Sequence, residues 1–190
     1  MFDGLSSGGR RSAPGEPVID GVLRPFLVPF ALLAGAGFVA SVVVHVLSWT
    51  PLVLPEWVMG LHFGIFVVWL PAVLAARPLT ADRPQRDFWR AALRGSPAWM
   101  RQLVRLTLAY AVLNFIVFLA TSFGREGAPT RGFSGHWMAF YGAAAAILWS
   151  ALHAVDERRL CLNGHVTSST ARFCEICGAG VAPTTGARAP

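Results

Sequence analysis

The sequence has little charge and contains no lysine. Charged residues make up 14% of its 190 residues, whereas 54% are hydrophobic. Soluble domains typically carry roughly 25% charged residues, so this shortage argues against an ordinary soluble domain and indicates a membrane protein. All 16 basic residues are arginine, which gives a formal net charge of +6. The missing lysine, together with abundant alanine and glycine, favours a bacterial source with a GC-rich genome.

Cysteine is also scarce. The three cysteines cannot all pair within one chain, so a disulfide framework is not expected. A reducing compartment for the segment that carries them is the simpler interpretation. Motifs of ordinary catalysis are missing too, because the sequence has no phosphate-binding glycine loop, no nucleophile elbow and no HExxH. We therefore expect a protein that is not an enzyme.

Charge is absent altogether from four long runs. A helix needs about 20 apolar residues to cross a bilayer core of about 30 Å. The runs without Asp, Glu, Lys or Arg are residues 26–49, 57–76, 106–124 and 133–155. Within a membrane domain at 23–157, we predict spans at about 26–49, 54–76, 98–123 and 133–155. The predicted fold class is an all-α membrane protein with a four-helix transmembrane bundle; buried helices of a soluble protein are the alternative.

The arginines predict how the bundle is oriented. They lie before the first run, between the second and third, and after the fourth, and only Arg125 and Arg131 fall in the other two loops. By the positive-inside rule, both termini and the long middle loop lie in the cytoplasm, so we expect a multi-pass protein of the bacterial cytoplasmic (inner) membrane. Residues 1–22 and 181–190, rich in small residues and proline, are predicted to be flexible tails.

The middle loop has a regular pattern of its own. Arg86, Arg90 and Arg94 recur every four positions, and Phe88 and Trp89 supply apolar contact. This pattern predicts a short interfacial helix on the inner leaflet, held in part by anionic lipid. A solvated basic connector is the alternative. Nucleic acid is not an expected partner, because basic loops at the inner face follow from topology alone.

Four potential metal ligands lie close together near the C-terminus. Cys174 and Cys177 form a C-x2-C pair, and Cys161 and His165 form a second pair, separated from the first by eight residues. Three thiolates and one imidazole match the tetrahedral ligand set of structural zinc. A segment of about 20 residues cannot bury a core of its own, so the metal would provide most of its folding energy.

This segment resembles the small zinc-ribbon family in "CLNGH" and "ARFCEICG", which cover about residues 160–180. His165 replaces one cysteine of the four-cysteine form. The resemblance implies a cytoplasmic ribbon at 158–180, with a structural metal and a surface for contact with protein or nucleic acid. The remaining sequence, with "GLHFGIFVVWLPAVL" and "RGFSGHWMAFY", resembles small bacterial membrane proteins of unassigned role.

Three histidines fall in the predicted spans. His45, His62 and His136 all lie toward the outer side, at depths that would suit a haem, a metal ion or a quinone. Neutral histidines that hydrogen-bond across the bundle are the alternative.

The leading functional hypothesis is an accessory, assembly or regulatory membrane protein whose ribbon contacts a protein partner or a second copy of the chain. A redox or metal-binding protein using the three histidines is one alternative. A small oligomeric transporter or channel is the other.

Overall fold

The computed structural model describes residues 24–81, 83–121, 128–154, 159–167 and 171–181. The predicted tails at 1–22 and 181–190 lie outside these ranges, except for Val181, and so does Arg125 of the predicted outer loop. The chain divides into a helical unit within Ile19–Ala154 and a second compact unit that contains Val155–Pro190.

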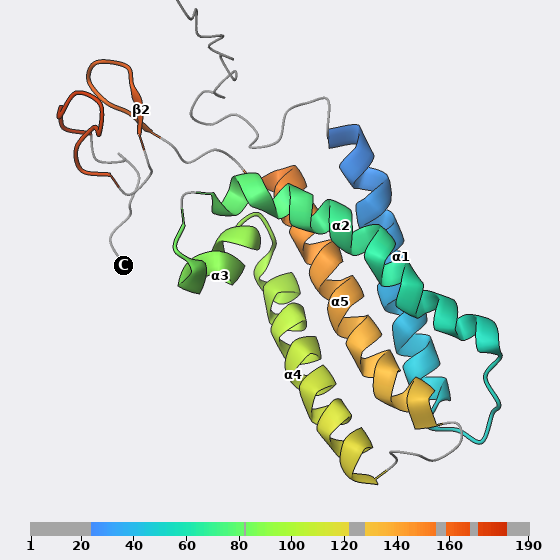
Figure 1. Ribbon diagram of the computed structural model, residues 1–190. Helices are drawn as coiled ribbons and strands as arrows, with labels where there is room; N and C mark the ends of the chain where they lie inside the picture. The colour runs from blue at the N-terminus through green and yellow to red at the C-terminus, as the bar shows by residue number, and fades with distance from the viewer. Residues whose placement is uncertain (1–23, 82, 122–127, 155–158, 168–170, 182–190) are drawn as a thin grey trace, which may run out of the picture. The chain divides into compact units, whose positions relative to one another are not determined.

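Four long helices build the helical unit (Figure 1). They are α1 (Arg24–Leu47), α2 (Gly60–Thr80), α4 (Ala98–Thr121) and α5 (Ala128–His153). A single 3-10 turn, η1 (Glu56–Met59), leads into α2. The segment between α2 and α4 contains the turn η2 (Gln85–Asp87) and the five-residue helix α3 (Phe88–Ala92).

Three of these helices are long and apolar enough to cross a membrane. They are Arg24–Leu47, Glu56–Thr80 and Ala98–Thr121. Their outer surfaces carry large apolar side chains that no other described part of the chain covers, among them Leu32 (70% exposed), Phe63 (70%) and Leu113 (60%). Exposed apolar surface on this scale is unfavourable in water and suits hydrocarbon. The chain is therefore consistent with a membrane protein.

Helix α5 lies at the centre of the bundle. It packs against α1, α2 and α4, and Figure 1 shows it between α4 and α1. Its side chains Trp137, Ile147 and Leu148 are almost fully buried. Because its neighbours cover most of its surface, α5 does not need the apolar exterior that lipid contact demands. Within the described residues it is not among the helices apolar enough to span, and the fourth crossing stays a prediction.

Small residues allow the helices to approach closely around Tyr141 of α5. A side chain at Gly37 of α1 would overlap the Tyr141 ring, and one at Gly64 of α2 would overlap its hydroxyl. That hydroxyl donates a hydrogen bond to the carbonyl oxygen of Leu61, at 2.9 Å. One tyrosine thus joins three helices, and the two glycines are the residues that make room for it.

The segment before α4 is tied to the C-terminal half of α5. The backbone N–H of Gly95 donates to Ser150 Oγ at 2.9 Å, and the buried Ser96 hydroxyl donates to the Ala146 carbonyl at 2.7 Å. Only a short helix, α3, forms where the interfacial helix was predicted; it contains Arg90, and its position at the inner leaflet stays a prediction. Arg86 lies before it in η2, and Arg94 follows its C-terminal end.

The C-terminal unit contains a small hairpin. Strands β1 (Arg159–Leu160) and β2 (Val166–Thr167) pair antiparallel, with Leu160 opposite Val166. Two isolated bridges join Cys161 to Val181 and Phe173 to Gly180. Val181, which the sequence assigned to the flexible tail, therefore belongs to this unit.

Candidate metal centre

Two tight turns position the four predicted ligands. In the first, the Gly164 N–H donates to the Cys161 carbonyl and the Cys161 N–H donates to the His165 carbonyl, each at 2.9 Å. Gly164 has a φ of 77°, which a residue with a side chain rarely adopts. This turn reverses the chain between β1 and β2 and brings Cys161 and His165 to the same end of the hairpin.

The second turn follows the same plan. The Gly178 N–H donates to the Cys174 carbonyl, and the Cys174 N–H donates to the Ala179 carbonyl, each at 2.8 Å. Gly178 also has a positive φ, of 69°. The sequence pairs a glycine with each ligand pair because the chain has to turn sharply around the position that the ligands share.

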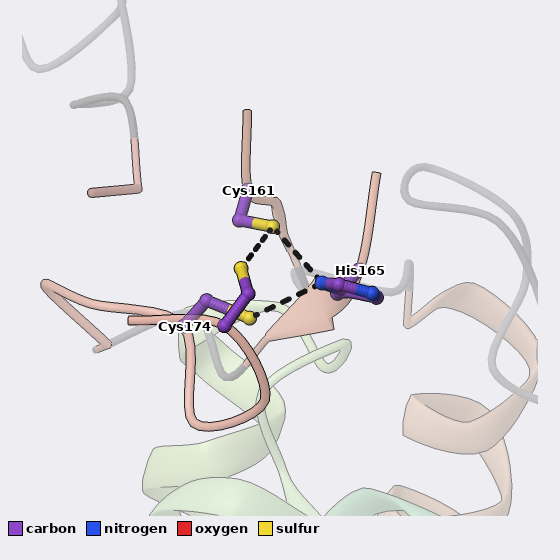
Figure 2. A group of neighbouring side chains, drawn as sticks. Cys161, His165 and Cys174 are labelled. Carbon is purple, nitrogen blue, oxygen red and sulfur yellow. Dashed lines mark hydrogen bonds between the residues drawn. The ribbon is translucent and has the colours of Figure 1, made fainter. Parts of the chain in front are cut away.

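The four ligand atoms converge on one point. Cys161 Sγ, His165 Nδ1, Cys174 Sγ and Cys177 Sγ all lie within 4.8 Å of one another. Figure 2 shows the sulfurs of Cys161 and Cys174 turned toward the His165 ring. Two turns that are separate in the sequence therefore supply one compact Cys3His group.

Three of the separations between these atoms match the edges of a tetrahedral zinc site. With Zn–S near 2.3 Å and Zn–N near 2.0–2.1 Å, tetrahedral edges are about 3.8 Å between two sulfurs and about 3.6 Å between sulfur and nitrogen. The Cys161 and Cys177 sulfurs lie 3.7 Å apart, and His165 Nδ1 lies 3.6 Å from Cys161 Sγ and 3.8 Å from Cys174 Sγ. The group could bind a metal ion, and the donor set is consistent with zinc.

The surroundings favour the thiolate form at Cys177, whereas burial raises the pKa of Cys174. The backbone N–H of Ala179 is the main cause that lowers the pKa of Cys177, to about 6, and the His165 side chain contributes. Cys161 and Cys174 are buried, whereas Cys177 is exposed at the edge of the group. A thiolate is the metal-binding form of cysteine, so a lowered pKa reduces the competition between protons and metal.

Large apolar side chains surround the ligands on the outside of the unit. Leu162 is 82% exposed, Phe173 67% and Ile176 63%, and each is adjacent to a ligand or lies between two of them. Sequence reasoning missed these residues as a surface. Apolar residues next to ligands, in a segment too short to bury a core, were the signal that could have identified them.

Of the three histidines in the helices, His45 is fully engaged in hydrogen bonds. Its Nδ1 pairs with Ser134 Oγ of α5 at 2.7 Å, and its Nε2 pairs with the Tyr110 hydroxyl of α4. The Trp49 ring N–H also donates to Nε2, at 3.2 Å. Arg131 lies over the Trp49 ring, with its guanidinium carbon 4.3 Å from the ring centre. His45 therefore connects α1, α4 and α5.

The other two histidines have separate surroundings. Trp137 donates its ring N–H to His62 Nδ1 at 3.2 Å, and aromatic rings surround His62. His136 contacts the Gly132 carbonyl of its own helix and the Phe115 ring. In the part of the chain that the structure describes, His45, His62 and His136 do not converge into a group of three ligands, unlike the Cys3His group.

Comparison with known proteins gave no match to a family model, to a curated protein or to a solved structure. The functional argument therefore depends on the chain's own residues, above all on the Cys3His group.

Proposed function

We propose that this protein is a non-catalytic integral membrane protein whose C-terminal unit is a zinc ribbon that contacts a partner protein. The observation that carries the proposal is the convergence of Cys161, His165, Cys174 and Cys177 within 4.8 Å. The distance between the Cys161 and Cys177 sulfurs fits zinc, and both turns that carry the four residues contain a glycine with positive φ. Its role in this proposal is that of an accessory, assembly or regulatory protein.

The zinc is structural in this proposal. Catalytic zinc sites keep one coordination position for water or substrate, whereas structural sites use four protein ligands. Here three thiolates and one imidazole would fill all four positions around a bound ion. A hairpin with two-residue strands has little hydrogen bonding of its own to hold it together. The metal therefore supplies most of the stability of this unit.

The membrane part crosses the bilayer four times. Three helices have the required length and apolarity, and α5, enclosed by them, is the fourth. A hydrogen bond from Arg24, at the start of α1, to the Leu152 carbonyl, near the end of α5, supports an antiparallel arrangement of these two helices. Four crossings place both termini on one side, and the distribution of arginines makes that side the cytoplasm of a bacterial cell.

The contact surface of the ribbon consists of Leu162, Phe173 and Ile176. Exposed apolar side chains on a small rigid unit are the kind of group that protein interfaces bury at their centre. In this proposal a cytoplasmic protein binds to the contact surface. The alternative, binding of a second copy of the chain, is distinguished by the cross-linking experiment below.

Measuring the metal content and the absorption spectrum of the protein tests whether it binds zinc. The full chain is purified in mild detergent, together with a Cys177→Ser variant and a Glu175→Gln control in the same turn. We expect one zinc per chain in the wild type and the control, less than one in C177S, and no visible absorbance. A Soret band, or a second transition metal lost on His45→Ala, would instead support the redox alternative.

Photo-cross-linking tests the contact surface. A photoreactive residue at position 162 is used in intact cells, with a Phe173→Ser/Ile176→Ser double variant and Glu175→Gln as the control. We expect one discrete protein adduct that persists in E175Q and disappears in the double variant, while zinc content is unchanged. An adduct of twice the chain mass identifies a second copy. Adducts with lipid alone would overturn the protein-contact proposal.

A further inference from the structure

A groove of about 580 Å³ lies along the segment that joins α3 to α4 and along the first turns of α4. Its volume falls within the range of roughly 300–1,000 Å³ that is usual for ligand sites. It is lined by Trp89, Arg90, Leu93, Arg94, Arg101, Val104, Arg105 and Leu108. All of these residues belong to the helical unit, and none is a member of the Cys3His group.

Among the described residues that line it, the groove concentrates positive charge without an acidic side chain. Four arginines line it, and no lining residue is acidic. Arg94 Nε is buried and has no hydrogen-bond partner among the described residues, whereas Arg101 Nη1 donates to the Ser96 carbonyl at 2.6 Å. Four guanidinium groups around one hollow repel each other, so a bound anion would stabilise the arrangement.

Apolar side chains line the groove together with the arginines. Leu93 and Val104 are buried, and Leu108 and Trp89 are 48% and 44% exposed. On α4, Arg101, Val104, Arg105 and Leu108 follow the spacing of a single helical face. Along this face Arg101 comes first and Leu108 comes last, farther into the apolar helix, with Val104 and Arg105 between them. The groove is therefore amphipathic along its length.

We propose that this groove is a binding site for one anionic glycerophospholipid. The guanidinium groups of Arg90, Arg94, Arg101 and Arg105 hold the phosphate and head group, and an acyl chain follows Val104 and Leu108 toward the membrane core. Arginine suits this role because its planar fork of N–H groups matches phosphate oxygens. The site differs from the loose attraction predicted from the sequence, because Arg86 does not line it and two arginines of α4 do.

This inference depends on the membrane part of the proposed function and not on the zinc ribbon. The protein is extracted from membranes, and only material recovered from the membrane fraction is used. If the purified chain contains one zinc but does not bind lipid, the proposal of a lipid site is wrong and the zinc proposal stands. If Cys177→Ser loses its zinc and still binds lipid, lipid binding does not depend on the ribbon.

Lipid titration by native mass spectrometry tests the site. The full chain is titrated with phosphatidylglycerol and, separately, with phosphatidylcholine of identical acyl chains. The test variant is Arg90→Gln/Arg105→Gln, which removes two of the four groove arginines. The matched control, Arg77→Gln/Arg86→Gln, removes the same charge from positions outside the groove.

We expect one phosphatidylglycerol per chain in the wild type and the control, with phosphatidylcholine bound more weakly. We expect an affinity at least tenfold lower in R90Q/R105Q. An equal decrease in both double variants would indicate diffuse electrostatic attraction and overturn the proposal. Inorganic phosphate that competes as well as the lipid would indicate a site for a free anion and overturn it too. A Leu108→Gln variant that weakens lipid binding but not phosphate binding would support the acyl-chain path.

Discussion

Among the four proposed zinc ligands, His165 is one that zinc chemistry allows to be exchanged for cysteine. Structural zinc accepts a set of four cysteines as well as a set of three cysteines and one histidine, and the turn that carries His165 also contains the flexible Gly164. We therefore predict that His165→Cys keeps one zinc per chain. His165→Ala removes one of four ligands, and a quarter of roughly 12 kcal/mol of zinc binding corresponds to about a 100-fold weaker affinity.

Zinc affinity measured by competition with a chelator of known affinity decides between these outcomes. Leu162→Ala is the control, because this exposed side chain lies in the same turn and is not a ligand. If H165A binds zinc as tightly as L162A does, His165 is not a ligand, and the site has only three protein donors.

Ser134 provides a second test at the scale of single residues. Its hydroxyl is fully buried, pairs with His45 Nδ1 at 2.7 Å and lies 3.2 Å from the Arg131 carbonyl. Ser134→Ala leaves the imidazole nitrogen without that partner, so we predict a loss of stability of roughly 1 kcal/mol. Thermal unfolding in detergent measures it.

Ser48→Ala is the matched control, since the Ser48 hydroxyl donates to the His45 carbonyl within its own helical turn. A smaller loss in S48A than in S134A is expected. Equal losses would mean that the bond between α1 and α5 adds nothing beyond a local serine contact.

At the scale of helices, Gly95 marks a close backbone approach between the segment before α4 and α5. A side chain placed there would meet the Ser150 carbonyl and lie 2.7 Å from the Ala154 backbone nitrogen. Backbone atoms cannot turn aside as a flexible side chain can, so Gly95→Ala has to push the segment before α4 away from α5. We predict a loss of stability of about 1–3 kcal/mol, measured by unfolding in detergent.

Gly35→Ala in α1 is the comparison, because nothing lies within 4 Å of the added methyl group. There we expect a small gain, since alanine favours a helix by roughly 0.5–1 kcal/mol over glycine. Should G95A be as stable as G35A, the packing of this segment against α5 is looser than the structure indicates.

The helices were the most predictable elements. Long uncharged runs identified α1, α2 and α4 because a helix that faces lipid has to be apolar around most of its circumference. The central position of α5 did not follow from such a run, since its Ser, Gly and Ala residues signal close packing but not which neighbours supply it. Pairs such as Ser96 with Ala146 join positions 50 residues apart, and no local pattern encodes them.

At the scale of the whole molecule, the two units differ in how much of their site the sequence revealed. The four residues of the Cys3His group lie within 17 residues and follow a known spacing, so their closeness in the fold could be predicted from the sequence. The arginine groove combines Arg90 and Arg94 with Arg101 and Arg105 of α4. The i, i+4 spacing of Arg101 and Arg105 was visible, but their closeness to α3 depends on the turn at Gly95, which only the folded chain displays.

This difference predicts that the two units respond separately to metal removal. In its described residues, the C-terminal unit has two-residue strands and two isolated bridges, and the Cys3His group is where its two turns meet. The helical unit is held by buried side chains and inter-helix hydrogen bonds that involve no metal. A strong zinc chelator should therefore unfold residues 159–181 and leave the helices intact.

Circular dichroism and limited proteolysis of the full chain in detergent check this prediction. We expect an almost unchanged helical signal, together with cleavage after Arg159 or Arg172 that is absent before chelation and suppressed when zinc is restored. The same cleavage should occur in Cys174→Ala without chelator, and it should stay absent in Glu175→Gln. Loss of the helical signal on chelation would mean that the bundle depends on the metal. A C-terminal unit that resists protease without zinc would show that the metal does not hold it together.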